Sequence, residues 1–196
     1  MDASDGHTSQ LQDARERLVG ELREHALVLG KVTLTSGAQA EYYVDAKRAI
    51  LLPAGFTALG VLLTAQLGIW EATAVGGLTM GADPVACAAL AGGASVKAFF
   101  IRKDAKRHGL QRRIEGPPLG PEDRCVVVED VVTSGGSTLA AIAALQDEGH
   151  EICGVISVLD RLAGGGAVIE RESGAPYVAL TTIDEIYPDR PDRKDG

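Results

Sequence analysis

The chain has 196 residues, of which 45% are hydrophobic and only 4% aromatic, and its formal net charge is −8. This size suits one domain whose core is filled by aliphatic side chains. The acidic charge argues against a nucleic-acid-binding protein, because such proteins depend on basic residues that contact phosphates. Any anionic substrate must therefore be held by a local basic cluster.

Neither a membrane span nor a secretory leader is expected. No apolar run reaches the length needed to cross a bilayer, and residues 1–10 lack the apolar centre of a signal peptide. The three cysteines, Cys87, Cys125 and Cys153, stand apart and form no C-x-x-C pair. They predict free thiols in a reducing compartment and no metal site, and we expect a cytoplasmic protein.

The N-terminal quarter predicts a small substructure that precedes the main repeat. Its predicted elements are a mobile tail, a helix and two short strands (residues 1–10, 11–29, 32–34 and 42–44), and a second helix predicted at 53–67 begins the core. The helical spacing of apolar residues and Gly30, which can end a helix, support the first helix. We expect residues 10–50 to form a hood over the edge of a sheet.

From residue 72 onward, apolar runs alternate with helical segments. Strands are predicted to begin near residues 72, 96, 125, 152 and 177, with helices at 84–90, 139–145, 167–172 and 183–186. This alternation implies βαβ units with right-handed crossovers. We predict one α/β domain with a central, mostly parallel five-stranded sheet, a core over about residues 52–186, and a polar tail at 189–196.

The most informative stretch runs from Cys125 to Thr138, where an apolar run leads into Glu129-Asp130 and a turn of small residues. Such a run is typical of a strand buried on both faces, which puts the acidic pair at its carboxyl end, where open α/β sheets bind ligands. The hydroxyls and glycines of the turn, followed by the start of a helix, predict a phosphate cradle. Because carboxylates repel phosphate, the pair predicts a sugar diol, with or without Mg²⁺.

Neither common nucleotide loop fits this turn, since no lysine follows Gly136 and G-x-G-x-x-G is absent. A plain strand, turn and helix with a polar cap is the alternative. The stretch resembles the motif that binds 5-phosphoribosyl 1-diphosphate (PRPP) in type I phosphoribosyltransferases. The resemblance implies their fold and a set of PRPP-binding residues: Glu129, Asp130, Val131, Val132, Thr133, Ser134, Gly135, Gly136 and Ser137.

A basic run, Arg102 to Gly109, follows a predicted strand. An ordinary solvated charge run is one interpretation, and a cationic lid over a diphosphate is the other. The run resembles the catalytic loop R-K-x-x-K-x-H-G of orotate phosphoribosyltransferases, which one subunit lends to its neighbour. The resemblance implies a homodimer with shared sites. It also implies that Arg102, Lys103, Lys106 and His108 bind PRPP, with Lys106, His108 and Asp130 as catalytic residues.

Arg161 comes directly after Asp160 at the end of another predicted strand. Its planar guanidinium can hold a carboxylate through two hydrogen bonds, although a surface pair with Asp160 is the alternative. Orotate phosphoribosyltransferases carry Asp-Arg at this place. The resemblance therefore implies that Arg161 binds orotate together with Thr133.

The segment from Lys31 to Arg48 resembles the hood of that family, in which Tyr42 or Tyr43 would pack on the pyrimidine ring. The alternative is two tyrosines on a half-buried strand. Many bacterial members carry lysines at the positions of Thr35 and Met80. Candidates for the missing charge are Lys31, Lys47, Arg48 or the backbone N–H groups of residues 76–81.

The resemblance implies a pentosyltransferase of pyrimidine nucleotide synthesis that converts orotate and PRPP into orotidine 5′-monophosphate and diphosphate. It implies Mg²⁺ as cofactor, bound mainly through PRPP and water with no direct protein ligand. A purine phosphoribosyltransferase is the enzyme alternative and would not need Arg161 or the basic loop. A PRPP-sensing regulator that binds nucleic acid is the second alternative, but it would require a basic face or an added DNA-binding domain.

Overall fold

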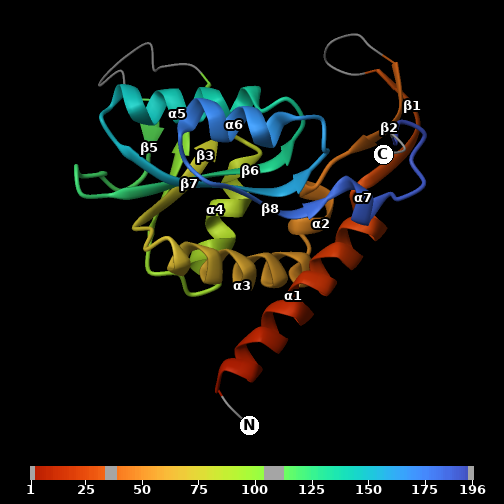
Figure 1. Cartoon of the computed structure of the whole chain (residues 1–196), viewed down its shortest axis with the longest axis horizontal. Helices are drawn as coiled ribbons and strands as arrows, with labels where there is room; N and C mark the ends of the chain where they lie inside the picture. The colour runs from red at the N-terminus through yellow and green to blue at the C-terminus, as the bar shows by residue number, and fades with distance from the viewer. Residues whose placement is uncertain (1–2, 34–38, 104–112, 194–196) are drawn as a thin grey trace.

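The structure is a computed structural model that describes residues 3–33, 39–103 and 113–193. These residues form a six-stranded sheet, a separate two-stranded hairpin and flanking helices (Figure 1). The helices are α1 (Ala3–His25), α2 (Lys47–Ile50), α3 (Pro53–Ile69), α4 (Ala82–Ala91), α5 (Gly136–Asp147), α6 (Gly165–Ser173) and α7 (Ile183–Ile186). The strands are β1 (Leu27–Thr33), β2 (Gln39–Val44), β3 (Ala74–Leu78), β4 (Lys97–Ile101), β5 (Ile114–Glu115), β6 (Arg124–Val132), β7 (Glu151–Asp160) and β8 (Tyr177–Thr182).

The main sheet has the strand order β5-β4-β3-β6-β7-β8. Five of these strands, all except β5, pair in parallel, so the predicted α/β fold with a mostly parallel sheet is confirmed. The short β5 adds an antiparallel edge to β4. It was not predicted because its two residues, Ile114 and Glu115, lie in a polar segment without an apolar run.

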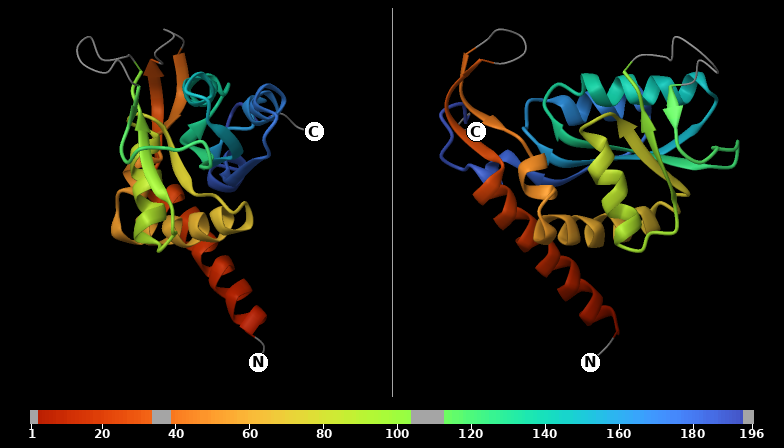
Figure 2. Two further views of the ribbon diagram at one scale, coloured as in Figure 1. Left: turned by 90° about the vertical axis from the view of Figure 1, so that its left-hand side faces the viewer. Right: turned by 180° about the vertical axis from the view of Figure 1, so that it is seen from behind.

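Helices cover both faces of the sheet, α3 and α4 on one and α5 and α6 on the other (Figures 1 and 2). The central strand β6 shows why its residues form this layer. Val126 and Val128 join the core under α3 and α4, while Cys125 and Val127 join the core under α5. Successive side chains of a strand point to opposite faces, so a continuous apolar run fills both layers at once.

Helix α1 and the β1–β2 hairpin differ from their predicted bounds. The helix begins at Ala3, so the tail predicted over residues 1–10 is wrong for the described residues, and the helix ends at His25 rather than near residue 29. Leu18 and Leu22 are fully buried at helical spacing. Leu27 pairs with Val44 of β2 instead of continuing the helix, since strand pairing outweighs the helical pattern there. Figure 2 shows that the N-terminal part of α1 projects beyond the sheet and its helices.

The last described residues are folded against the protein. Helix α7 starts with a capping box in which Thr182 and Glu185 exchange hydrogen bonds. Beyond it, Asp189 and residues 191–193 are exposed, as the predicted polar tail implies, but the Arg190 side chain is only 8% exposed and pairs with Asp184. No helix in the described ranges has both the length and the apolar character of a membrane span.

Candidate functional site

The acidic pair lies near the carboxyl end of β6, as predicted, although the strand continues to Val132. Glu129 and Asp130 are 5% and 8% exposed, so both carboxylates are largely removed from water. One oxygen of Asp130 accepts a hydrogen bond from the N–H of Val131 at 2.9 Å. One hydrogen bond does not compensate a carboxylate for the loss of water, and the structure places a cation beside it.

That cation is Lys47, at the start of α2. Its Nζ lies 2.7 Å from Oδ2 of Asp130 and 2.9 Å from Oδ1 of Asp45. Burial alone would lower the pKa of Lys47, but the hydrogen bonds to Asp130 and Asp45 raise it above its ordinary value. Lys47 is one of the three side chains that the sequence offers in place of the lysines absent at positions 35 and 80. Arg48 is exposed and makes no ion pair with a described residue.

Glu129 has no cationic partner and keeps one carboxylate oxygen unpaired among the described residues. Its Oε1 accepts the N–H of Asp130 at 3.2 Å, while Oε2 is buried and has no partner within the described part of the chain. Burial, and then the negative charge of Asp130, raise the pKa of Glu129 to about 8. The unpaired oxygen is therefore available to a ligand hydroxyl.

Gly81 packs directly against the acidic pair. A Cβ at this position would lie 2.5 Å from Oδ1 of Asp130 and 2.7 Å from Oε1 of Glu129. Any larger residue would push the carboxylates out of place. The glycine thus brings the backbone that follows β3 into contact with the end of β6.

The predicted phosphate cradle forms a hollow of about 270 Å³ between β6 and α5, lined by Glu129 and residues 131–138. Gly135 adopts φ +83° just before α5, and no side chain caps the helix. The first N–H groups of α5 thus lack intrahelical acceptors and suit an anion. The Thr138 hydroxyl is buried with no hydrogen-bond partner among the described residues. The hollow offers hydrogen-bond donors matched to a phosphate.

Helix α6 supports this turn from behind. A Cβ at Gly165 would lie 2.5 Å from the carbonyl oxygen of Thr133 and 3.0 Å from the nitrogen of Gly135. The sequence showed three consecutive glycines at residues 164–166 but did not indicate their contact with the cradle. That contact is seen only in the structure, where the start of α6 packs against the turn that precedes α5.

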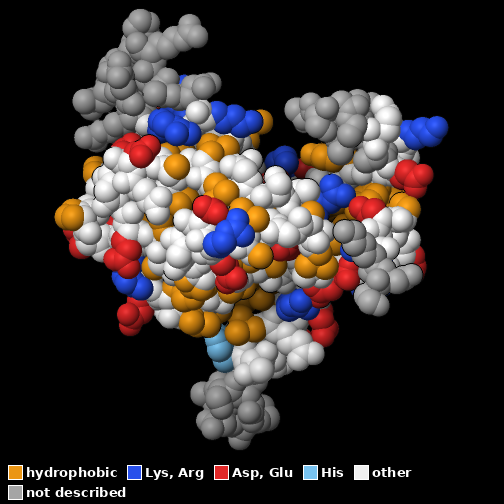
Figure 3. Space-filling model, turned by 45° about the horizontal axis from the view of Figure 1, so that its top comes forward, with side chains coloured by type: hydrophobic (Ala, Val, Ile, Leu, Met, Phe, Trp, Pro, Cys, Tyr) orange, Lys and Arg blue, Asp and Glu red, His pale blue; other side chains and the backbone are white. Residues whose placement is uncertain are grey.

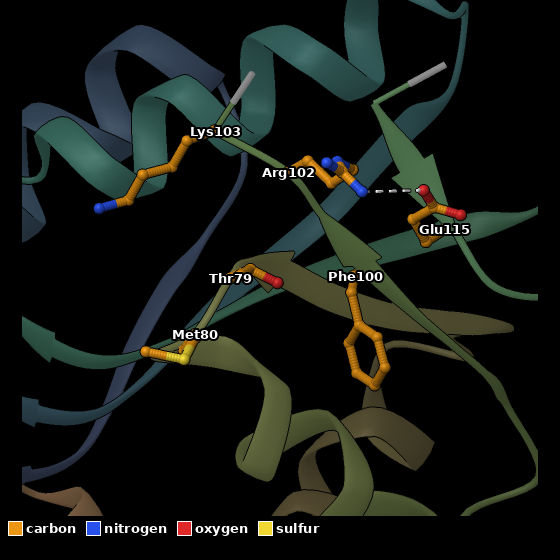
Figure 4. Close-up of a pocket in the computed structure, with 6 residues that line it drawn as sticks. All are labelled: Thr79, Met80, Phe100, Arg102, Lys103 and Glu115. Carbon is orange, nitrogen blue, oxygen red and sulfur yellow. Dashed lines mark ion pairs between the residues drawn. The ribbon is translucent and has the colours of Figure 1, made fainter. Parts of the chain in front are cut away.

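A second hollow, of about 640 Å³, lies beside the ends of β3 and β4. The N–H of Thr79 donates to the carbonyl oxygen of Ile101, which aligns the two strand ends. Figure 4 shows Arg102 turned toward Glu115, with Nη1 and Oε1 3.7 Å apart, while Lys103 extends away from that pair. The rest of the predicted basic loop, including Lys106, His108 and Gly109, lies outside the described residues, as do Thr35 and residues 36–37.

Arg161 and Thr133 leave neighbouring strands, because the N–H of Arg161 donates to the carbonyl oxygen of Val132 at 2.9 Å. The predicted alternative, a pair between Arg161 and Asp160, is not found. Asp160 instead accepts the N–H of Leu162 at 2.7 Å.

The guanidinium of Arg161 lies over Tyr42, 5.0 Å from the ring centroid, and its Nη2 donates to the Tyr42 hydroxyl at 2.9 Å. Its Nε is buried without a partner in the described ranges. The two hood tyrosines differ, since Tyr42 is 3% exposed and Tyr43 is 40% exposed. Figure 3 shows Lys and Arg side chains on both sides of a hollow between the sheet and the hairpin.

Comparison with known proteins identifies the family. An orotate phosphoribosyltransferase of Corynebacterium glutamicum (strain R) is 46% identical over 175 residues, which cover 89% of this chain and 94% of that protein. This chain belongs to the orotate phosphoribosyltransferase family. The orotate phosphoribosyltransferase of Streptomyces coelicolor is 44% identical over 180 residues, covering 90% and 98%. No family model matches the chain.

Solved structures agree with this assignment. The orotate phosphoribosyltransferase of Mycobacterium tuberculosis, in complex with Fe(III) dicitrate, aligns with a TM-score of 0.80 at 42% identity over 89% of this chain and 99% of that chain. The same enzyme in complex with PRPP gives a TM-score of 0.73 at 34% identity, over 89% and 92%. The predicted type I fold and orotate phosphoribosyltransferase activity are confirmed.

The site's oxygen donors bear on whether the protein itself could hold Mg²⁺. No three His, Cys, Asp or Glu side chains converge anywhere in residues 3–33, 39–103 and 113–193. Mg²⁺ usually keeps several waters and takes one or two carboxylates together with substrate phosphates. Asp130 is paired with Lys47 and burial raises the pKa of Glu129, so Mg²⁺ would be held mainly through PRPP oxygens and water.

Proposed function

We propose that the chain transfers the 5-phosphoribosyl group from PRPP to orotate in the hollow between the cradle, the acidic pair and Arg161. The observation that carries this proposal is the pairing of Lys47 with Asp130 at 2.7 Å beside an unpaired Glu129 oxygen. It supplies a cation that offsets the nearby carboxylates and a free acceptor at the edge of a phosphate-sized hollow. A sugar that carries phosphate needs both.

The 5′-phosphate would occupy the cradle of residues 131–137. Two features support this position: the free N–H groups at the start of α5 and the unpaired Thr138 hydroxyl. Gly135 and Gly165 allow the backbone to approach closely, and Ser134 and Ser137 are exposed to the hollow. No charged side chain is required, since the helix end itself favours an anion.

The ribose would lie over the acidic pair, with its hydroxyls hydrogen-bonded to Glu129 and Asp130. As the bond between the anomeric carbon and diphosphate breaks, positive charge grows on the sugar ring. The carboxylate of Asp130 would stabilise that charge, and Lys47 would stabilise the departing negative charge. Mg²⁺, when bound through PRPP oxygens and water, supplies further charge neutralisation for the diphosphate.

The diphosphate would be held by Arg102, Lys103, Lys106 and His108, which match the family's loop position by position. Arg102 and Lys103 line the hollow of about 640 Å³ where the loop begins. By family resemblance, these side chains come from the partner subunit of a homodimer. Closure over the site would also exclude water from the reactive sugar.

Orotate would bind against Arg161 and Thr133, which leave neighbouring strands. The buried, unpaired Nε of Arg161 supports this role, because it offers a donor to the carboxylate that uracil lacks. A nitrogen of orotate would then attack the anomeric carbon as diphosphate leaves. We further infer that the chain acts as one domain in the cytoplasm, as expected for an enzyme of nucleotide synthesis.

The test is orotate consumption, followed by its absorbance with purified protein. Turnover should require both PRPP and Mg²⁺, and adenine and hypoxanthine should not replace orotate. Asp130→Asn should reduce turnover at all orotate concentrations, whereas Asp147→Asn, at the far end of α5, should not. Turnover of a purine in place of orotate would contradict the proposal.

A further inference from the structure

The segment after α7 contacts the side chain proposed to recognise orotate. The carboxylate oxygens of Asp192 each lie 3.0 Å from the hydroxyl of Tyr42. One of them is also 3.7 Å from Nη2 of Arg161. These contacts join a residue near the end of the chain to β2 of the hood and to the end of β7.

Asp192 is held in this position by its own segment. Nε of Arg190 lies 3.2 Å from one Asp192 oxygen, and Arg190 also pairs with Asp184 of α7. Tyr187 packs edge-on against Tyr42, with ring centroids 5.4 Å apart at 85°. In this pair the Arg190 side chain is 8% exposed and the Asp192 side chain 55% exposed, so the guanidinium is shielded from water while the carboxylate stays partly hydrated.

The Tyr42 hydroxyl connects the two charged groups. It accepts from Nη2 of Arg161 and donates to Asp192. Burial raises the pKa of Tyr42, so the phenol keeps the proton that it donates. The guanidinium is thus fixed by a hydrogen bond and by the ring beneath it, while its Nε remains free for an acceptor.

We propose that Asp192 is a positioning residue that sets the specificity of the site: through the Tyr42 hydroxyl it fixes the guanidinium of Arg161 for a carboxylate-bearing base. The inference rests on the proposed role of Arg161 in binding orotate. Asp192 does not touch the substrate. It acts by removing conformational freedom that Arg161 would otherwise lose when orotate binds.

The test compares Asp192→Asn with Asp189→Asn, a matched control three residues earlier whose exposed side chain has no described contact. Asp192→Asn should raise KM for orotate roughly three- to tenfold, the effect of one weakened hydrogen bond, with KM for PRPP within about twofold. In a Tyr42→Phe background the same substitution should change KM for orotate by less than about twofold, because the connecting hydroxyl is gone.

Several results would overturn the inference. An equal rise in both KM values, or a lower melting temperature with KM for orotate unchanged, would mean that the segment only stabilises the fold. A lower KM for orotate would mean that Asp192 competes with the substrate carboxylate. Arg161→Ala separates this inference from the proposed function. If Arg161→Ala raises KM for orotate and Asp192→Asn does not, the positioning role alone fails; if Arg161→Ala has no effect, the orotate site itself is misassigned.

Discussion

Replacing Lys47 with methionine tests the electrostatics of the site most directly. Methionine keeps an apolar stem of similar length and removes the ammonium that lies 2.7 Å from Asp130 and 2.9 Å from Asp45. Asp130, with a side chain only 11% exposed, then lies unpaired next to Glu129. Both the free protein and its complex with PRPP should respond.

The size of the effect follows from the contacts. A hydrogen bond to a charged group contributes about 1.5–3 kcal/mol, and about 1.36 kcal/mol is a tenfold change in rate. Lys47→Met should therefore lower kcat/KM for PRPP roughly ten- to hundredfold. Because the Lys47 side chain is 33% exposed, solvent screening favours the lower end of that range.

The assay measures steady-state orotate consumption, first with PRPP varied at saturating orotate and then with the substrates exchanged. Arg48→Met is the matched control, since Arg48 lies on the same short helix, is exposed and pairs with no described residue. It should behave as the unmodified protein. Lys47→Arg should recover much of the activity, because the positive charge is retained.

The reasoning would be refuted if Lys47→Met kept kcat/KM for PRPP within about twofold of the unmodified protein while its melting temperature fell. That outcome would make the Lys47–Asp130 pair a purely structural contact. A loss that appeared only in KM for orotate would equally remove Lys47 from the PRPP site.

Three further predictions concern the same site. Gly81→Ala should lower kcat/KM for PRPP at least about tenfold, because its Cβ would lie 2.5 Å from Asp130, whereas Gly68→Ala, with open space around it, should change stability by no more than about 1 kcal/mol. The pKa of Glu129 is raised from 4.5 to about 8, so the folded protein binds more protons than the unfolded chain between those values, and stability should fall as pH rises through them. Melting temperatures across that range should show this fall, and Glu129→Gln should abolish its share of it. Lys106→Ala should lower kcat far more than it raises KM for orotate, as measured by steady-state kinetics, because its contact forms as charge develops on the diphosphate.

The sequence predicted the parts of this protein that depend on local patterns. The β-branched run before Glu129 predicted a strand buried on both faces, and the small residues after it predicted a tight turn. Leu18 and Leu22 at helical spacing similarly predicted α1. The helix ends earlier than predicted, because residues 27–29 carry a pattern compatible with a helix and become a strand only by pairing with β2.

The parts that were not predicted depend on contacts between distant segments. Lys47 and Asp130 are 83 residues apart, and the pairing of Asp192 with Tyr42 spans 150 residues. No local pattern distinguishes Lys47 from Arg48, since both are basic residues of one short helix. Only the tertiary fold, which turns one inward and leaves the other exposed, separates them.

The same contacts answer the electrostatic problem that the sequence raises. PRPP is a strong anion, yet this chain has a net charge of −8 and places two carboxylates at the proposed site. The pKa of Glu129 is about 8, so near neutral pH this side chain is largely protonated. The Nζ of Lys47 lies 2.7 Å from Asp130 and 2.9 Å from Asp45. The raised pKa of Glu129 and the ammonium of Lys47 therefore reduce the negative charge beside the cradle, which favours the approach of a phosphate. In the proposed complex, contact of the ribose hydroxyls with Glu129 and the growth of charge on the sugar would favour ionisation of Glu129 at the place where positive charge must be stabilised.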